Sequence, residues 1–261
     1  MTATPQLLPP RIPRRTTGDR LLLPLRAVYG AYAGAVFLAL ALLALPPLAV
    51  LPTLAGRRRL IQWVGRSVLA LMGMPVRVRW HGPLPDPCIV IANHCSYLDG
   101  VVLAALLPPR FDFVIKREMN SVPLAGFLLT RIGVQFVARG NRAGSSQDAL
   151  RVIRRALRGG SLAFFPEGTF LREPGLLRFH TGAFAAAERS GTPVVPLAIR
   201  GTRRRLAPGS CLPSPGVIEV ATLEPLWASP GHADGAAALR DAARAAILGA
   251  TGEIDALGGK A

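Results

Sequence analysis

The chain has 261 residues, which is enough for one sizeable domain or two small ones. Half of its residues are hydrophobic, which excludes an intrinsically disordered protein, and its 27 glycines and 24 prolines are too few for a low-complexity chain. The 31 basic residues outnumber the 15 acidic ones and give a formal net charge of +16. A chain that is both basic and apolar is expected to meet an anionic surface, and the apolar share favours lipid over nucleic acid.

The first 75 residues are predicted to form a mobile tail followed by membrane-associated helices. Residues 1–23 combine prolines and arginines without an apolar period, and we expect a mobile basic tail there. From Ala27 to Gly56 the chain carries no charged residue. As a helix, Ala27–Leu45 would be about 28 Å long, just enough to cross the core of a bilayer. Pro46 and Pro47 are expected to interrupt this helix.

Basic residues flank the apolar segment at both ends, with Arg26 before it and Arg57–Arg59 after it. The positive-inside rule therefore gives no orientation to a single span. A helix–proline–helix hairpin that enters and returns to the cytoplasmic face satisfies both flanks. Residues 24–75 are thus predicted to form membrane-associated helices, with Ile61–Met74 along the interface. A single span and a buried core helix are the alternatives, whereas a signal peptide fits poorly because the apolar stretch is too long.

Residues 76–232 are predicted to form an α/β domain with a mixed sheet flanked by helices, because short apolar runs alternate there with amphipathic stretches. A C-terminal helix and tail are expected over residues 233–261. The expected strands are Val76–Trp80, Ile89–Ala92, Ser161–Phe165, Val194–Ile199 and Val217–Thr222. The expected helices are Val101–Leu107, Asp148–Arg158 (which Gly159 caps), Ala183–Arg189 and Ala236–Leu248.

The cysteines point to reduced thiols rather than to a metal site. Cys88, Cys95 and Cys211 have neither a metal-ligand spacing nor a CxxC spacing. We therefore expect no bound metal and a cytosolic environment for these side chains.

The first candidate for chemistry is the segment Asn93–Asp99, which joins a buried strand to a helix. His94 and Asp99 are the residue types of half a charge relay, in which an imidazole accepts a proton and a carboxylate fixes its tautomer. Ser96 and Asp99 also fit a helix capping box, so Asp99 has a purely structural alternative. This spacing alone is a weak signal.

Three further segments lie on or after apolar strands. A glutamate, a glycine and a threonine close the segment Phe165–Thr169, at the edge where α/β proteins bind ligands, although a tight turn would use the same residues. The segment Gly133–Arg139 places an arginine just after a strand. Val194–Ile199 is a strand whose proline removes one backbone donor.

In this order and spacing, the segments resemble the motifs of the glycerolipid acyltransferase family that includes 1-acyl-sn-glycerol-3-phosphate acyltransferase. The family's NHxxxxD, GxxFxxR, FPEGTR-like and VP-containing blocks correspond to Asn93–Asp99, Gly133–Arg139, Phe165–Phe170 and Val194–Ile199. The resemblance covers roughly residues 76–205, half of the chain, and it implies the α/β fold of that family.

The resemblance implies transfer of a fatty acyl group from acyl-CoA or acyl carrier protein to the free hydroxyl of a lysophospholipid. The favoured acceptor is 1-acyl-glycerol-3-phosphate, which gives phosphatidate. His94 would be the general base, Asp99 would orient its imidazole, and no acyl-enzyme would form, so Cys95 is not expected to be a nucleophile. No cofactor beyond the acyl thioester is implied. The implied substrate-binding residues are Arg139, for the acceptor phosphate, with Lys116, Glu167, Gly168, Thr169 and Arg172.

One position departs from the family pattern: Phe170 stands where the third block usually ends in arginine. Arg172 or Arg178 would have to supply the missing charge, and a lyso-aminolipid or another hydroxylated lipid stays open as the acceptor. A basic module that binds membranes or nucleic acid without catalysis is the alternative of a different class. The aromatic content of 6% and the lack of a recognisable motif argue against nucleic acid. The expected location is the cell membrane, with the active site on the cytoplasmic face, where both donors occur.

Overall fold

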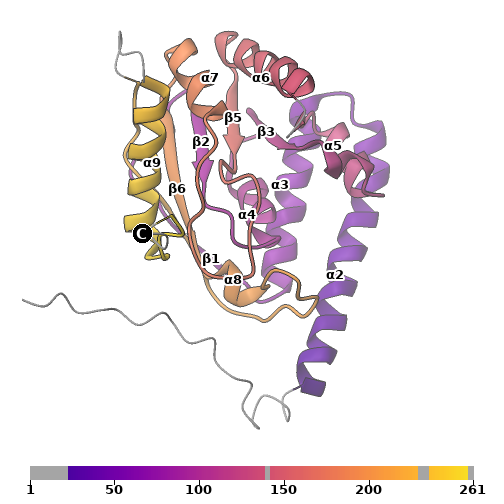
Figure 1. Ribbon diagram of the computed structural model, residues 1–261. Coiled ribbons are helices and arrows are strands. Elements are labelled where there is room, and N and C mark those ends of the chain that lie inside the picture. Colours follow the sequence, from indigo (N-terminus) through magenta and orange to yellow (C-terminus); the bar gives the residue numbers. More distant parts are fainter. Residues whose placement is uncertain (1–22, 139–141, 229–234, 258–261) are drawn as a thin grey trace, which may run out of the picture.

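The computed structural model describes residues 23–138, 142–228 and 235–257. At its centre lies a seven-stranded sheet in the order β1-β7-β6-β2-β5-β3-β4 (Figure 1). Neighbouring strands are parallel except for β6 and β7, so the sheet is mixed, as the sequence predicts. The strands are β1 (Val76–Arg79), β2 (Ile89–Ala92), β3 (Phe111–Lys116), β4 (Gln135–Val137), β5 (Ser161–Phe164), β6 (Val194–Arg200) and β7 (Ile218–Thr222).

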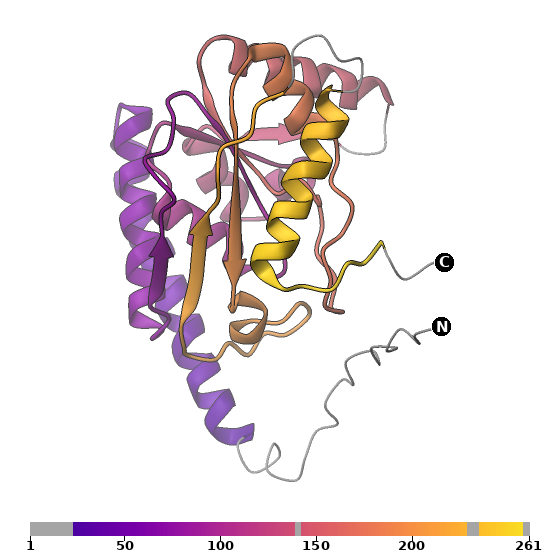
Figure 2. The ribbon, with the colours of Figure 1, turned by 90° about the vertical axis from the view of Figure 1, so that its left-hand side faces the viewer.

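Helices cover both faces of the sheet (Figure 2). The first group is α6 (Arg142–Leu157), α7 (Gly182–Ser190) and α9 (Gly235–Thr251); the second is α2 (Leu23–Val50), α3 (Leu54–Leu71), α4 (Leu98–Leu106) and α5 (Ala125–Arg131). In β2, Ile89 and Ile91 pack with the first group, whereas Val90 and Ala92 pack with α3 and α4. Successive residues of a strand point to opposite faces, so a strand covered on both faces must be apolar throughout.

The two N-terminal helices form an antiparallel pair, with α2 lying along α3 (Figure 1). The expected interruption at Pro46 and Pro47 is wrong, because α2 continues through both prolines to Val50. The prolines lie in its last turn, where the amide of Leu51 still donates to the carbonyl of Pro47. α3 also begins earlier than predicted, at Leu54, and the side chain of Thr53 caps it by accepting from the amide of Gly56 at 3.2 Å.

One face of α2 is apolar and exposed. Among the helices of the described residues, α2 is long and apolar enough to cross a membrane. Only 22% of an 18-residue apolar stretch of this helix is buried against the rest of the protein. The exposed side chains include Leu25, Val28, Phe37, Leu38, Leu42, Leu43 and Val50. A helix that leaves so many large apolar side chains uncovered is a candidate membrane helix.

A buried charge group ties α3 to the sheet. Arg58 forms an ion pair with Asp112 in β3 and donates to the carbonyl of Ile132 at 2.9 Å. Arg155 of α6 reaches the same carboxylate from the opposite face at 2.5 Å. The Asp112 side chain is only 4% exposed, and the two arginines give each of its carboxylate oxygens a charged partner.

Candidate active site

The site lies where the carboxyl ends of β2, β5 and β6 meet at one edge of the sheet. Asn93, the first residue after β2, binds the backbone of β6 through both ends of its side-chain amide. Its Nδ2 donates to the carbonyl of Ile199 at 2.9 Å, and its Oδ1 accepts from the amide of the same residue at 2.7 Å. This pair of bonds fixes the start of the loop that carries His94.

His94 and Asp99 are in direct contact, with 2.9 Å between Nδ1 and Oδ2. The same oxygen accepts from the backbone amides of Cys95 at 2.7 Å and Ser96 at 2.8 Å, and the carboxylate is fully buried. Asp99 therefore contacts the imidazole and holds the loop before α4, whereas the expected capping box forms only in part, because the N-cap of α4 is Tyr97 and has no side-chain cap. A carboxylate only accepts hydrogen bonds, so Nδ1 carries the proton and Nε2 is left as an acceptor.

Glu167 joins the His94 loop to the segment that follows β5. Its Oε1 accepts from the amide of His94 at 2.6 Å, and its Oε2 accepts from the amide of Leu177 at 2.8 Å. Burial raises the pKa of this carboxyl to about 7. Both oxygens of Glu167 are thus engaged with backbone amides, whereas the sequence suggests that this side chain binds substrate.

Gly168 forms the tight turn that the sequence leaves as an alternative. It has a φ of +75°, and its amide donates to the carbonyl of Phe165 at 3.0 Å. That amide is engaged in the turn, whereas the next residue, Thr169, is exposed.

Aromatic rings surround the imidazole, which the sequence did not predict. Phe165 stacks on His94 with 4.1 Å between ring centroids, and Phe170 meets it edge-on at 4.3 Å. Tyr97 in turn meets Phe170 edge-on at 4.9 Å. The phenylalanine that replaces the usual arginine therefore lies against the candidate base itself.

A cavity of about 330 Å³ extends from this aromatic group between the sheet and the N-terminal helices. Tyr97 and Phe165 line it next to the site, and Phe37 and Val64 supply walls from α2 and α3. Almost all of its lining is apolar, which suits a hydrocarbon chain.

The side chain of Cys95 contacts Thr202 and not the imidazole of His94. Its Sγ lies 3.2 Å from the hydroxyl of Thr202, and its side chain is buried. Burial raises the pKa of the thiol to about 12, so it stays protonated and is a poor nucleophile.

The other predicted substrate-binding residues have no contact with His94 or Asp99 among the described residues. Lys116 ends β3 and forms a partly exposed ion pair with Glu118 at 3.6 Å. Arg172 and Arg178 are exposed on the segment that follows Phe170. Arg139 falls outside the described residues.

Comparison with known proteins places this architecture in one class. The fold matches the crystal structure of the 1-acyl-sn-glycerophosphate (LPA) acyltransferase PlsC from Thermotoga maritima with a TM-score of 0.67 and 18% identity, covering 88% of this chain and 97% of that one. The family model described as Acyltransferase matches residues 76–200.

Two curated relatives are acyltransferases that are named for lipid acceptors. A 1-acyl-sn-glycerol-3-phosphate acyltransferase from Saccharomyces cerevisiae is 31% identical over 68% of this chain and 61% of its own length. A lyso-ornithine lipid O-acyltransferase from Pseudomonas aeruginosa is 36% identical over 55% of this chain and 54% of its own length. Residues 76–200 thus form an acyltransferase domain, and the chain is similar to the 1-acyl-sn-glycerol-3-phosphate acyltransferases. It spans between about half and three-fifths of the length of these two relatives.

Proposed function

We propose that this protein transfers a fatty acyl group from an acyl thioester to the free hydroxyl of a lysophospholipid. The observation that carries the proposal is the 2.9 Å contact between His94 and Asp99 beside an apolar cavity of about 330 Å³. The histidine supplies a base for an alcohol, and the cavity suits a fatty acyl chain. The names of the relatives point to the same reaction.

In the proposed mechanism, Nε2 of His94 removes the proton of the acceptor hydroxyl as that oxygen attacks the thioester carbonyl. A C–O bond forms, the C–S bond breaks, and the leaving thiolate takes the proton from the imidazolium. Asp99 stabilises the imidazolium through its bond to Nδ1. The buried, protonated thiol of Cys95 supports direct transfer without an acyl-enzyme.

The first acceptor that we propose is 1-acyl-glycerol-3-phosphate, which gives phosphatidate. We assign its phosphate to Lys116, which ends β3 at the edge that carries His94, and to Arg139, which follows β4 by two residues. A guanidinium and an ammonium suit a phosphate monoester.

A lyso-aminolipid is the second candidate acceptor, and a specific observation favours it. Phe170 places an uncharged ring against His94, where an arginine would offer a positive charge to a phosphate. The relative from Pseudomonas aeruginosa is named for a lyso-ornithine lipid.

We further propose that the exposed apolar face of α2 lies in the membrane and that the active site opens toward the cytoplasmic face. The exposed Trp63 of α3 and Phe127 of α5 extend the apolar surface beyond α2. We call the apolar cavity of about 330 Å³ the acyl cavity. Its walls include α2 and α3, so in this arrangement it borders the lipid from which the acceptor comes.

The test is an acyl-transfer assay on the detergent-solubilised protein, with acyl-CoA or acyl carrier protein as donor. Lysophosphatidate, a lyso-aminolipid and a neutral lysolipid serve as acceptors. We expect turnover of at least one acceptor, and we expect it to vanish in His94→Ala. His81→Ala is the matched control, because His81 is exposed and lies outside the site. Normal turnover in His94→Ala would refute the proposal.

A further inference from the structure

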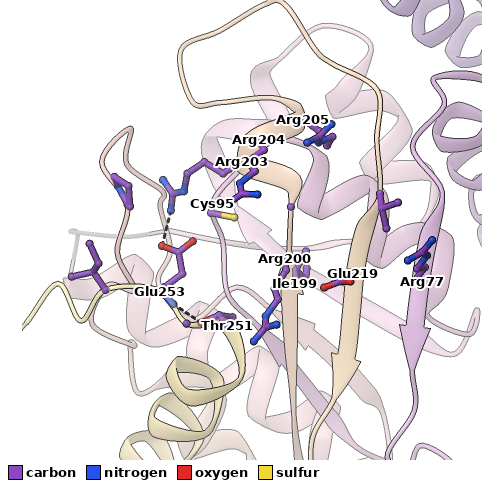
Figure 3. A pocket seen from close by; sticks show the side chains of 15 residues that line it. Arg77, Cys95, Ile199, Arg200, Arg203, Arg204, Arg205, Glu219, Thr251 and Glu253 are labelled. Carbon is purple, nitrogen blue, oxygen red and sulfur yellow. Dashed lines mark hydrogen bonds and ion pairs between the residues drawn. The ribbon is translucent and has the colours of Figure 1, made fainter. Parts of the chain in front are cut away.

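A second cavity, of about 810 Å³, lies beside the active-site loop on the other side of β6 (Figure 3). Its floor includes Cys95, the residue next to His94. β7 runs antiparallel to β6, and β1 runs parallel to β7, so the first residues of β7 and β1 meet the last residues of β6 at this edge. We call this cavity the arginine cleft, after the lining side chains Arg77, Arg200, Arg203, Arg204 and Arg205.

The arginine cleft carries a positive excess, because five arginines face two acidic residues, Glu219 and Glu253. Glu219 lies between Arg77 and Arg200 in the cross-strand register. Glu253 is already engaged, since it pairs with Arg203 at 3.5 Å and accepts from the amide of Gly175 at 2.9 Å. The remaining positive charge favours an anionic ligand.

Three of the arginines donate hydrogen bonds to backbone carbonyls of the segments around the cleft. Arg203 donates to the carbonyls of Leu171 and Glu173, both at 3.0 Å, and so holds the segment that follows Phe170. Arg200 and Arg205 bind backbone carbonyls near the end of α9 and in the loop before β7. These three side chains are already engaged with backbone, so removing one would change the shape of the cleft as well as its charge.

The side chains of Arg77 and Arg204 differ from the other three. Both are exposed, and neither makes a hydrogen bond or an ion pair with another described residue. Figure 3 shows Arg77 on its strand at one side of the cleft and Arg204 next to Arg203 and Arg205. Two guanidinium groups left free in a concave, basic site are well placed to bind phosphate oxygens.

The position of the cleft relative to His94 indicates which phosphate it takes. Lys116, which we assign to the acceptor, ends β3 on one side of β2, whereas the arginine cleft lies over β6, β7 and β1 on the other side. Two phosphate-bearing substrates that react at one histidine repel each other, so separate sites on either side of it suit the reaction.

We infer that the arginine cleft binds the phosphate groups of a phosphopantetheine-type acyl donor, an inference that rests on the proposed function. The cavity volume lies within the range of about 300–1,000 Å³ that is typical of small-molecule sites. Arg77 lies three strands from β2, or about 14 Å at the usual strand spacing. An extended pantetheine arm bridges such a distance, which leaves the thioester at His94 and the phosphates among the arginines.

The test measures coenzyme A binding by calorimetry with the full chain in the His94→Ala background, so that binding is read without turnover. Adding Arg77→Ala or Arg204→Ala is expected to weaken coenzyme A binding about tenfold each, as for the loss of one charge-assisted hydrogen bond. Pantetheine, which lacks phosphate, should bind all variants equally. Arg79→Ala is the matched control, because Arg79 lies on the same strand outside the cleft, and it should bind coenzyme A like the parent.

Steady-state kinetics separate this inference from the proposed function. With His94 restored, Arg77→Ala and Arg204→Ala should raise KM for acyl-CoA about tenfold and leave KM for the acceptor unchanged. Unchanged coenzyme A affinity in both variants would overturn the inference even if acyl transfer is observed. Weaker binding to phosphatidylglycerol vesicles with unchanged coenzyme A affinity would overturn it too, because a lipid headgroup would then be the ligand. Phosphate-dependent coenzyme A binding without turnover of any acceptor would refute the proposed function and leave the cleft assignment standing.

Discussion

The substitution Asp99→Asn should lower turnover moderately, because the backbone fixes how the new amide is oriented. Oδ2 of Asp99 accepts from the amides of Cys95 and Ser96 as well as from His94, whereas the buried Oδ1 has no hydrogen-bond partner among the described residues. The amide oxygen of an asparagine must therefore take the place of Oδ2, and its nitrogen must take the place of Oδ1. His94 keeps its tautomer and exchanges a charged partner for a neutral one.

The size of the effect follows from that exchange. A hydrogen bond to a charged group is worth about 1–2 kcal/mol more than a neutral one. If this difference is lost only when the imidazole becomes charged, turnover should fall about 5- to 30-fold. In a triad where the amide forces the wrong tautomer, the same change costs about 10⁴-fold.

Initial rates at saturating substrate, together with the melting temperature, check this reasoning. Asp99→Ala is the contrasting variant, since it leaves two buried amides without an acceptor and should lower both stability and turnover more strongly. A 10⁴-fold loss in Asp99→Asn at unchanged melting temperature would refute the argument, because it would mean that the imidazole had changed tautomer.

Three further outcomes are expected. Because burial raises the pKa of Glu167 to about 7, its native state keeps a proton that the unfolded chain loses near pH 4.5, so the free energy of unfolding should fall by about 3 kcal/mol in total as pH rises from about 4.5 to 7. Thermal melts of Glu167→Gln should lack this fall. Arg58→Ala should destabilise the protein by about 3–5 kcal/mol, because it leaves a buried carboxylate undercompensated, whereas the exposed Arg59→Ala should change little in denaturant melts. Gly100→Leu should shift donor preference toward shorter acyl chains, because Gly100 lines the apolar cavity and an added Cβ there meets no atom within 4 Å, which leaves the leucine side chain to occupy the cavity. Gly249→Leu should leave the preference unchanged, because a Cβ at Gly249 also meets no atom within 4 Å and this position lies outside the cavity.

Each of these outcomes has a result that would count against it. Parallel pH–stability curves for wild type and Glu167→Gln would mean that the carboxyl titrates normally. Equal melts of the Arg58 and Arg59 variants would mean that the buried ion pair contributes little. An unaltered chain-length profile in Gly100→Leu would place the acyl chain elsewhere.

The sequence predicts two kinds of strand, those that are apolar throughout, such as β2, and those in which apolar and charged residues alternate, such as β1. Ile89–Ala92 matches β2 in both bounds, because a central strand covered on both faces needs four consecutive apolar residues. β3 was missed because Asp112 breaks its apolar run, and only Arg58 and Arg155, which are distant in sequence, make that position tolerable in the core. The compensation of the Asp112 charge depends on tertiary structure, so no pattern in the sequence near Asp112 reveals it.

The candidate site divides in the same way. The pairing of His94 with Asp99 follows from a spacing of five residues across a strand end, and the structure brings the two side chains together. The contact of Phe170 with His94 depends on how the loop after β5 folds back over the site, which no spacing reveals. For Glu167 the sequence identifies a residue of the site but not its role. The resemblance suggests a substrate contact, whereas in the structure the carboxylate accepts hydrogen bonds from two backbone amides.

The link between α3 and β3 has a practical consequence for preparing a water-soluble form of this protein. A shortened chain that begins at Val76 would keep every motif, yet it would remove Arg58 from the buried Asp112. It would also remove Val68 and Leu69 from the core that they share with β2, and it would open one wall of the apolar cavity to water. The N-terminal helices and the sheet are therefore one folding unit, and solubility should be sought by replacing the exposed leucines of α2 rather than by truncation.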